Sequence, residues 1–197
     1  ISTKSPCYPR SGKPAASERL QKHVLDHRPD LLVISYGLND ARGGTPLPLF
    51  QAEMAAVIRT IRRSIDPLIV LPSPYYMTDF NGGGRAWTKA NLEIFHGYGR
   101  GIEAVAKKEG CLFVDLLEAS GHADWIVHYD GIHQSDLGHR IVANRIFEVL
   151  ATTGGWIQIP YPNSNDWSAN RNKVQWLPTG LPDGTCLFKA TTKEAFA

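Results

Sequence analysis

Residues 31–40 read LLVISYGLND, and this stretch decides the fold. Its first five residues form a short apolar run of the type expected for a buried strand in a parallel sheet. A glycine follows closely, and then the polar side chains of Asn39 and Asp40. At the carboxyl end of a parallel strand, such a turn lies where α/β proteins place their ligands. We therefore expect a functional site after this strand.

Strand and helix patterns alternate along the first 150 residues. Apolar runs at 68–71 and 111–114 predict two further strands. Apolar residues recur at helical spacing over 50–65 and again over 94–105, which predicts one long helix in each connection. Alternation of this kind requires crossover connections. It predicts a parallel sheet covered by helices on both faces.

Three features of the connections give further expectations. Residues 1–14 are rich in proline and are expected to form a loop. Residues 72–87 contain two prolines and three consecutive glycines, so this loop is expected to be exposed and mobile. Thr88 is expected to cap the helix that follows it.

Residues 128–142 read HYDGIHQSDLGHRIV and carry a second chemical signal. Asp130 and His133 lie three residues apart in a short turn, and Ser135 is placed to cap the apolar helix that follows. A carboxylate beside an imidazole accepts from one ring nitrogen and leaves the other free to take a proton from a hydroxyl. Such pairs also arise in solvated loops, but this one predicts a general base, His133, oriented by Asp130.

Composition limits the classes of partner. The 197 residues, 43% of them hydrophobic, suffice for one domain with an appendage. A net charge of +2 argues against nucleic acid or an anionic membrane surface as the main partner. No apolar run approaches the ~20 residues of a membrane-spanning helix. The three cysteines lie far apart and do not decide the compartment, and we expect neither a metal nor a cofactor.

Together, the two motifs resemble the SGNH, or GDSL-type, esterase and lipase family. The Gly-x-Asn-Asp sequence that ends at Asp40 is similar to the third block of that family, and the Asp-x-x-His sequence is similar to its fifth. The resemblance covers roughly residues 10–150. It implies a three-layer α/β sandwich, with a flavodoxin-like parallel sheet and helices on both faces, and a Ser-His-Asp triad.

The resemblance also implies roles for single residues. His133 and Asp130 complete the triad. Asn39 supplies a side-chain amide to the oxyanion hole, and Gly12 is the candidate for the second-block glycine that adds a backbone N–H. Asp40 is expected to brace its loop rather than to react.

The first block of the family, Gly-Asp-Ser, occurs nowhere in these residues. In the family it ends a central strand, and its serine is the nucleophile. Loss of a central strand would leave unpaired backbone and a hole in the core. We therefore expect that the first strand is missing from this chain and that the nucleophile lies upstream or on another chain. Neither Ser35 nor Ser73 has the sequence context of a nucleophile.

Family substrates are small acyl esters, fatty esters and O-acetyl groups on sugars. Four aromatic rings in the loops suit a sugar face or an acyl chain, and they favour an O-acetyl esterase acting on carbohydrate: Tyr75, Tyr76, Trp87 and Trp125. The alternative is a catalytically inactive carbohydrate- or ligand-binding module derived from such a hydrolase. A flavodoxin-like nucleotide binder is disfavoured because no glycine-rich phosphate loop follows a strand.

The composition changes after Gly154-Gly155. Residues 1–154 are predicted to form the hydrolase-like domain, and residues 155–197 an irregular or β-rich appendage or linker. The tail is rich in Trp and Asn, which suggests attachment to a larger extracellular or virion-associated protein.

Overall fold

The structure is a computed structural model that describes residues 1–153 and two later strands, β4 (Val174–Pro178) and β5 (Cys186–Ala190). The chain divides into two compact units, Ile1–Val149 and Leu150–Ala197, and each is described by itself. In the second unit, β4 and β5 pair antiparallel. The rest of the appendage predicted at 155–197 lies outside the described residues, and the predicted domain boundary stays a prediction.

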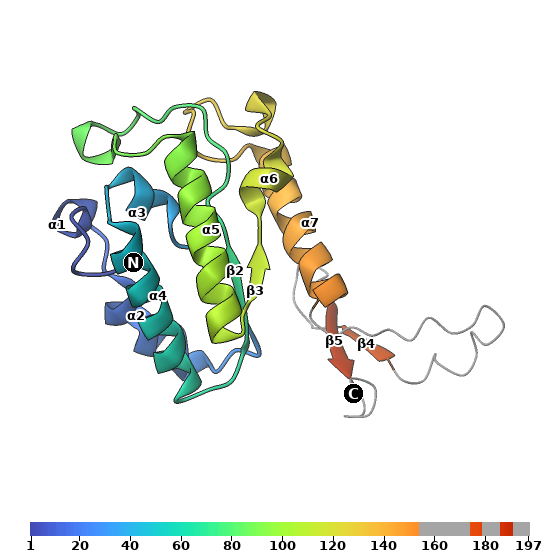
Figure 1. Ribbon diagram of the computed structural model, residues 1–197. Helices are drawn as coiled ribbons and strands as arrows, with labels where there is room; N and C mark the ends of the chain where they lie inside the picture. The colour runs from blue at the N-terminus through green and yellow to red at the C-terminus, as the bar shows by residue number, and fades with distance from the viewer. Residues whose placement is uncertain (154–173, 179–185, 191–197) are drawn as a thin grey trace. The chain divides into compact units, whose positions relative to one another are not determined.

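The first unit contains a parallel sheet of three strands in the order β1-β2-β3 (Figure 1). These strands are β1 (Leu31–Val33), β2 (Leu68–Pro72) and β3 (Leu112–Val114). Because the strands are parallel, their carboxyl ends meet at one edge of the sheet. The predicted α/β fold with a parallel sheet is confirmed.

Helices and 3₁₀ turns occupy the connections. In chain order they are α1 (Tyr8–Ser11), α2 (Ala16–His23), η1 (Leu25–His27), α3 (Leu38–Arg42), α4 (Leu47–Arg62), η2 (Arg85–Trp87), α5 (Leu92–Glu109), α6 (Leu116–Ser120), η3 (Asp124–Ile126) and α7 (Asp136–Thr153). The segment at 1–14, which was expected to be a loop, therefore contains the short helix α1.

The core lies between the sheet and the helices α4 and α5. These two helices pack on each other, and α5 also packs on β2 and β3 (Figure 1). Their inner faces present side chains that are fully buried: Phe50, Met54, Ile58, Phe95 and Ile102. Burial of each such side chain contributes about 1.5–3 kcal/mol. The predicted helical spacing of these residues is confirmed.

One edge of strand β1 pairs with no other strand among the described residues. Ile34 N–H donates to the carbonyl of Val70 at 2.9 Å, so the even-numbered residues of this segment bond to β2. In a parallel strand, the backbone N–H and C=O groups of alternate residues point to opposite sides. Those of Leu31 and Val33 therefore point away from β2, where no strand of the described residues pairs with them. Their side chains are 45% and 40% exposed. The prediction of a buried strand is wrong for these two positions, because their side chains lie on a face of the sheet that the described residues leave partly uncovered.

Helix α7 also exposes apolar side chains. Leu137 is 46% exposed and Phe147 is 64% exposed, and the described residues from His139 to Thr152 are all half-buried or exposed. An amphipathic helix gains most of its stability from packing of its apolar face. Within the described residues, that face of α7 is only partly covered.

The loop at 72–87 is anchored at its start. Ser73 and Met77 are buried, and Met77 belongs to the core cluster. The expectation of an exposed loop therefore holds for Gly83 and Gly84 but not for these first residues. The loop follows β2 directly, and the core below it takes up its apolar side chains.

The start of α5 differs from its prediction. The side chain of Asn91 accepts the N–H of Ile94 at 2.8 Å, so Asn91 is the cap and the helix begins at Leu92. Thr88 instead donates to the carbonyl of Arg85 in the 3₁₀ turn η2. Both residue types cap helices well, and the extra turn decides between them.

Gly37 lies between β1 and α3 in a backbone conformation that favours glycine. Its φ is +126°, in the region that L side chains rarely adopt. A Cβ atom at this position would lie 3.2 Å from Ile102 Cδ1 and 3.4 Å from Phe50 Cζ, both in the core. The glycine thus sets how closely the strand and the first turn of α3 approach α4 and α5.

We predict that Gly37→Ala lowers the free energy of unfolding by about 2–4 kcal/mol, because backbone strain and crowding of the core add. Gly97→Ala is the matched control, since Gly97 lies within α5 and a Cβ there meets no atom within 4 Å. The control should raise stability by up to about 1 kcal/mol. Urea unfolding followed by circular dichroism measures both, and equal effects would contradict the role of Gly37.

Candidate active site

Asp130 and His133 form a close pair in the turn that leads into α7. Asp130 Oδ2 lies 2.6 Å from His133 Nδ1. The other carboxylate oxygen, Oδ1, accepts the backbone N–H groups of Ile132 and His133, each at 2.9 Å. The imidazole side chain is 69% exposed. With Nδ1 held by the carboxylate, Nε2 remains accessible to a substrate or a nucleophile.

These hydrogen bonds hold the pKa of Asp130 well below its usual range. The largest cause is the hydrogen bond to the His133 side chain, followed by the backbone N–H groups of His133 and Ile132. Each of these donors favours the charged form of the carboxyl group. Asp130 is therefore an ionised acceptor, which is the form that orients an imidazole.

The residues after His133 fix the turn to its surroundings. Ser135 Oγ donates to the carbonyl of Ile126 at 2.9 Å and accepts the N–H of Gly138 at 3.3 Å, so the predicted cap of α7 is confirmed. Gln134 is buried, and its Nε2 donates to the carbonyl of Tyr76 at 2.9 Å. The turn is thus attached to η3 and to the loop after β2.

Gly131 provides a second attachment to that loop. Its carbonyl oxygen accepts the backbone N–H groups of Thr78 and Asp79, each at 2.9 Å. Its φ is +72°, and a Cβ atom would lie 2.6 Å from Asp79 Cβ. Backbone meets backbone at this point without room for a side chain, so the loop and the turn are held in one arrangement.

Asn39 and Asp40 lie next to each other in α3 but differ in burial. Asp40 is buried, and its Oδ1 accepts from the nitrogen of Ile1 at 2.7 Å and from Ser5 Oγ at 3.4 Å. Asp40 thus contacts the first residues of the described chain, and its expected role in bracing its own loop stays a prediction. Asn39 is exposed, and its Oδ1 accepts from Arg42 Nη1 at 3.4 Å. Its Nδ2 amide group meets no partner among the described residues and can donate to a substrate.

Arg42 links Asn39 to the loop that contacts the His133 turn. Its Nη2 donates to the carbonyl of Gly82 at 2.6 Å. A Cβ atom on Gly82 would lie 3.1 Å from Ile132 Cδ1, so this part of the loop touches the turn. Sequence reasoning missed Arg42. Its distance of three residues from Asn39 could have indicated it, because residues three apart in a helix lie on the same face.

The hydroxyl of Tyr75 interacts electrostatically with Asp130 and with Arg42. Burial is the largest cause that raises the pKa of its hydroxyl, the negative charge of Asp130 raises it further, and the positive charge of Arg42 lowers it. Of the two tyrosine candidates, Tyr75 is the one whose pKa the charge of Asp130 influences.

Tyr76 and Trp87 pack against residues that neighbour the candidate site. The hydroxyl of Tyr76 donates to Asp124 Oδ1 at 2.9 Å, and its ring stacks on that of His122 with centroids 5.2 Å apart. Trp87 is half-buried in η2, where its ring faces Gly83. A role of either residue in substrate binding stays a prediction.

Two aromatic rings near the turn are exposed. Trp125, in η3, is 66% exposed. Tyr129 is 94% exposed, and its ring lies 3.8 Å from that of His128. Sequence reasoning did not select Tyr129, although it directly precedes Asp130. Exposed rings beside a candidate base offer flat apolar surfaces to a ligand.

Gly12 lies apart from these contacts. It ends the short helix α1 with a φ of +61°, and it is exposed. A Cβ atom there would meet nothing within 4 Å. Among the described contacts, none joins Gly12 to Asn39 or to His133. The geometry is that of an ordinary helix end, and its oxyanion role stays a prediction.

The two serines considered as nucleophiles, Ser35 and Ser73, lie in surroundings that, among the described contacts, do not include His133. Ser73 is buried, and its Oγ accepts the N–H of Leu116 at 2.8 Å and lies 3.2 Å from Asp115 Oδ1, so it supports the start of α6. Ser35 is exposed just after β1. Neither contacts His133 among the described hydrogen bonds.

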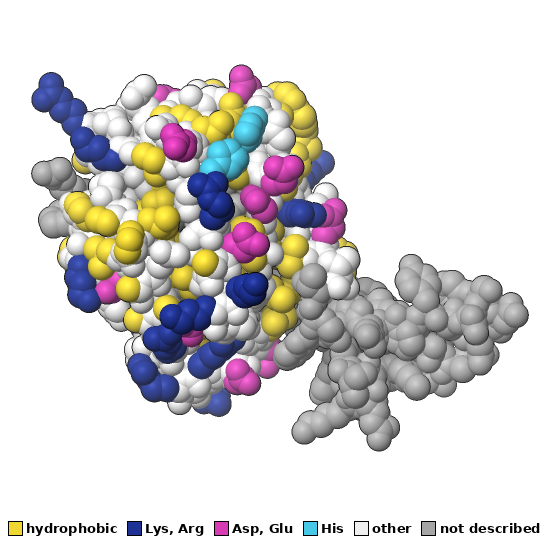
Figure 2. All heavy atoms as spheres, in the orientation of Figure 1, with side chains coloured by type: hydrophobic (Ala, Val, Ile, Leu, Met, Phe, Trp, Pro, Cys, Tyr) yellow, Lys and Arg dark blue, Asp and Glu magenta, His cyan; other side chains and the backbone are white. Residues whose placement is uncertain are grey.

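Three further features concern the described part of the chain as a whole. No three His, Cys, Asp or Glu side chains of this part of the chain gather as metal ligands. Within it, no helix has the length and apolar character needed to cross a membrane. On the face drawn in Figure 2, the Lys and Arg side chains are interspersed with acidic and uncharged ones.

Solved structures with the same fold include two ester hydrolases. Acetylxylan esterase Axe2 from Geobacillus stearothermophilus is 20% identical, with a TM-score of 0.55, and the match covers 68% of this chain and 65% of that protein. The lipase/acylhydrolase from Enterococcus faecalis is 24% identical, with a TM-score of 0.56, and the match covers 68% of this chain and 67% of that protein. The chain thus spans about two thirds of the length of Axe2.

No curated protein shows a significant match. The profile of the GDSL-like Lipase/Acylhydrolase family matches residues 7–141 of the 197. This range contains both motifs, from Asn39 to the His133 turn. The chain therefore belongs to the GDSL-like lipase/acylhydrolase family.

Proposed function

We propose that the protein is a serine esterase that hydrolyses short-chain acyl esters. The observation that carries this proposal is the pair of Asp130 and His133, which lie 2.6 Å apart with the carboxylate ionised and the ring exposed. In acyl transfer, His133 takes the proton of the nucleophile and returns it to the leaving alcohol. Asp130 holds the ring and stabilises the imidazolium that forms.

Asn39 is the proposed donor to the oxyanion. Its side-chain oxygen is occupied by Arg42, which leaves the Nδ2 amide to face the negative charge that develops on the ester oxygen. Donors that are fixed before the reaction cost no reorganisation in the transition state. Asn39 and the His133 turn are joined through Gly82, and this link supports their action at one centre.

The proposed nucleophile is a serine on a further strand that pairs with the free edge of β1. The backbone groups of Leu31 and Val33 point to that edge, and their side chains are exposed. A parallel strand added there lies about 4.8 Å from β1, and its carboxyl end lies beside the turn at 36–39. A serine that directly follows such a strand is thereby placed next to Asn39.

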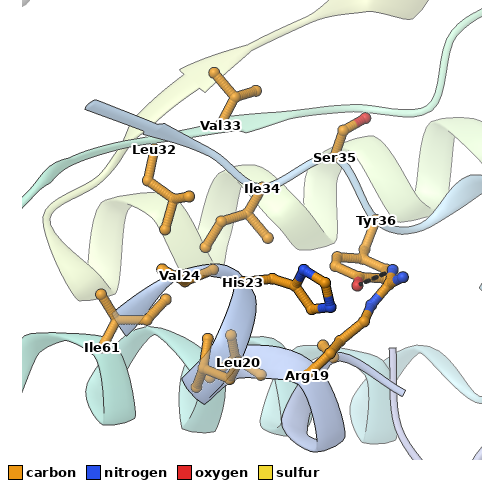
Figure 3. A pocket seen from close by; sticks show the side chains of 12 residues that line it. Arg19, Leu20, His23, Val24, Leu32, Val33, Ile34, Ser35, Tyr36 and Ile61 are labelled. Carbon is orange, nitrogen blue, oxygen red and sulfur yellow. Dashed lines mark hydrogen bonds between the residues drawn. The ribbon is translucent and has the colours of Figure 1, made fainter. Parts of the chain in front are cut away.

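A groove beside β1 supports this placement (Figure 3). It has a volume of about 320 Å³ and lies between β1, α2 and α4. Figure 3 shows Leu32 and Ile34 directed toward Leu20 and Val24 of the α2 region, while Val33 points away. An added strand would send alternate apolar side chains into this groove, which would continue the existing core.

The proposed substrate is an O-acetyl group on a carbohydrate. Trp125 and Tyr129 present exposed rings on the segment that leads to the His133 turn, and rings of this kind stack on sugar faces. The similarity in fold to an acetylxylan esterase agrees with this choice. A small acyl group also agrees with the site, because neighbouring rings such as that of Tyr76 are fixed by contacts of their own and are not free to move aside for a long chain.

We predict that the native polypeptide releases acetate from p-nitrophenyl acetate and from acetylated xylo-oligosaccharide. His133→Ala should lower kcat/KM by roughly 10²–10⁴-fold, because the general base is lost. His139→Ala, an exposed residue of α7, should stay within about twofold of the native rate. Equal rates for both variants would exclude His133 as the base. Ligand binding without turnover would indicate the inactive binding module instead.

Amide exchange tests the proposed strand. In the native polypeptide, the amides of Leu31 and Val33 should exchange as slowly as that of Ile34, whose hydrogen bond to β2 makes it the internal control. A fluorophosphonate probe should label a serine that follows Gly-Asp. Fast exchange at Leu31 and Val33, or a label on Ser35 or Ser73, would contradict the proposed source of the nucleophile.

The pH dependence of the turn follows from Asp130. Because its folded pKa is depressed, the stability contributed by its ionised form is present above about pH 4 and is lost as the pH falls through the folded value. The backbone amide resonances of Ile132 and His133 should therefore titrate well below the ordinary Asp range. Asp130→Asn should abolish this titration, and Asp66→Asn, at an exposed position, should not. A midpoint in the ordinary range would refute the depressed pKa.

A further inference from the structure

Arg42 is a buried cation that the proposed reaction does not yet use. Its side chain is 5% exposed, and its Nε has no hydrogen-bond partner among the described residues. Desolvation is the largest influence on its pKa and lowers it, while the negative charges of Asp79 and Asp130 oppose this effect. Burial of a guanidinium is unfavourable unless its contacts compensate. Its position therefore needs an explanation in terms of those contacts.

Both contacts of the guanidinium reach the candidate site. Nη1 donates to Asn39 Oδ1 at 3.4 Å, and Nη2 donates to the carbonyl of Gly82 at 2.6 Å. A Cβ atom on Gly83 would lie 3.1 Å from Nη2, so the loop backbone lies directly against the cation. The backbone of Arg42 is held as well, because its carbonyl accepts the N–H of Lys89 at 3.0 Å.

The first contact decides which end of the Asn39 amide faces the site. An exposed Asn side chain can rotate and present either its oxygen or its nitrogen. A cation at Oδ1 favours one orientation, with Nδ2 directed away from Arg42. It also polarises the amide and strengthens its N–H groups as donors. An oxygen presented to a developing oxyanion would repel it.

The second contact positions the loop that carries Gly82. This loop touches Ile132, and Asp79 of the same loop donates to the carbonyl of Gly131. Arg42 thus joins the turn after β1 to the turn that holds His133. The planar fork of a guanidinium can serve both acceptors at once, which a lysine ammonium does less well.

We propose that Arg42 is a positioning residue that orients the oxyanion donor Asn39 and fixes the loop at 79–84 against the His133 turn. The part of this proposal that concerns turnover rests on the proposed esterase function. The part that concerns geometry does not, because the order of the Asn39 side chain and of the loop can be measured without a substrate.

The kinetic test compares Arg42→Gln, Arg42→Lys and the exposed control Arg140→Gln in the native polypeptide, with p-nitrophenyl acetate as the substrate. Arg42→Gln should lower kcat about 10–100-fold and change KM less than about threefold, because an oriented oxyanion donor acts mainly in the transition state. The kcat of Arg42→Lys should lie between that of Arg42→Gln and that of the native protein. A loss of folded protein alone would lower kcat in proportion to the unfolded fraction measured by circular dichroism.

The structural test uses two readouts. The heteronuclear NOE of Asn39 Nδ2, assigned with Asn39→Asp, should fall toward that of a free side chain in Arg42→Gln. Trypsin should cleave after Arg85, just beyond the loop, about tenfold faster than in the native protein, because loop opening is easier. Arg140→Gln should change neither readout.

The outcomes separate the two proposals. Unchanged Asn39 order and unchanged cleavage in Arg42→Gln would overturn the positioning role. If both readouts change but the native polypeptide shows no turnover, the positioning role stands and the esterase function fails. If Arg42→Gln does not fold, the same measurements on Arg42→Lys decide, because that variant keeps the charge and loses the fork.

Discussion

The carbonyl oxygen of Gly131 accepts two backbone hydrogen bonds, and the geometry of the site depends on them. The donors, Thr78 and Asp79, belong to the loop after β2, so a turn distant in sequence is attached to the carboxyl edge of the sheet. Helix α7 contributes less to this attachment, since its apolar face is only partly covered in the described unit. Backbone contacts of this kind tolerate no side chain, which is why a glycine separates Asp130 from Ile132.

Two opposite charges act at the site. Arg42 is positive, Asp130 is negative, and Tyr75 is influenced by both. Burial of Arg42 and Tyr75 strengthens the interactions of these two groups, because less water screens them. Within the described residues, Asp130 is held in its ionised form, and Asn39 Oδ1 accepts from Arg42.

Much of the fold could be predicted because it depends on periodicity. The apolar spacing of α4 and α5 identified the core, and the alternation of elements predicted a parallel sheet. The pairing of Asp130 with His133 follows from their spacing in one turn. By contrast, sequence reasoning did not select Arg42, since nothing local shows that the loop near Gly82 will lie against it.

Other differences also have a tertiary origin. Thr88 and Asn91 cap helices about equally well, and the 3₁₀ turn before α5 decides between them. Leu31 and Val33 were predicted to be buried because an apolar run does not show whether another element covers each face of the strand. Tyr129 gave no signal of its own, since exposure of a ring depends on what the rest of the chain leaves uncovered.

The free edge of β1 has a consequence for solubility. A strand with unpaired N–H and C=O groups and exposed branched side chains is a template for pairing with another copy, and natural sheets protect such edges with charges, prolines or bulges. Pro29 and Asp30 stand just before the strand, but β1 itself carries no such protection. Preparations of these 197 residues alone should therefore self-associate more readily as their concentration rises.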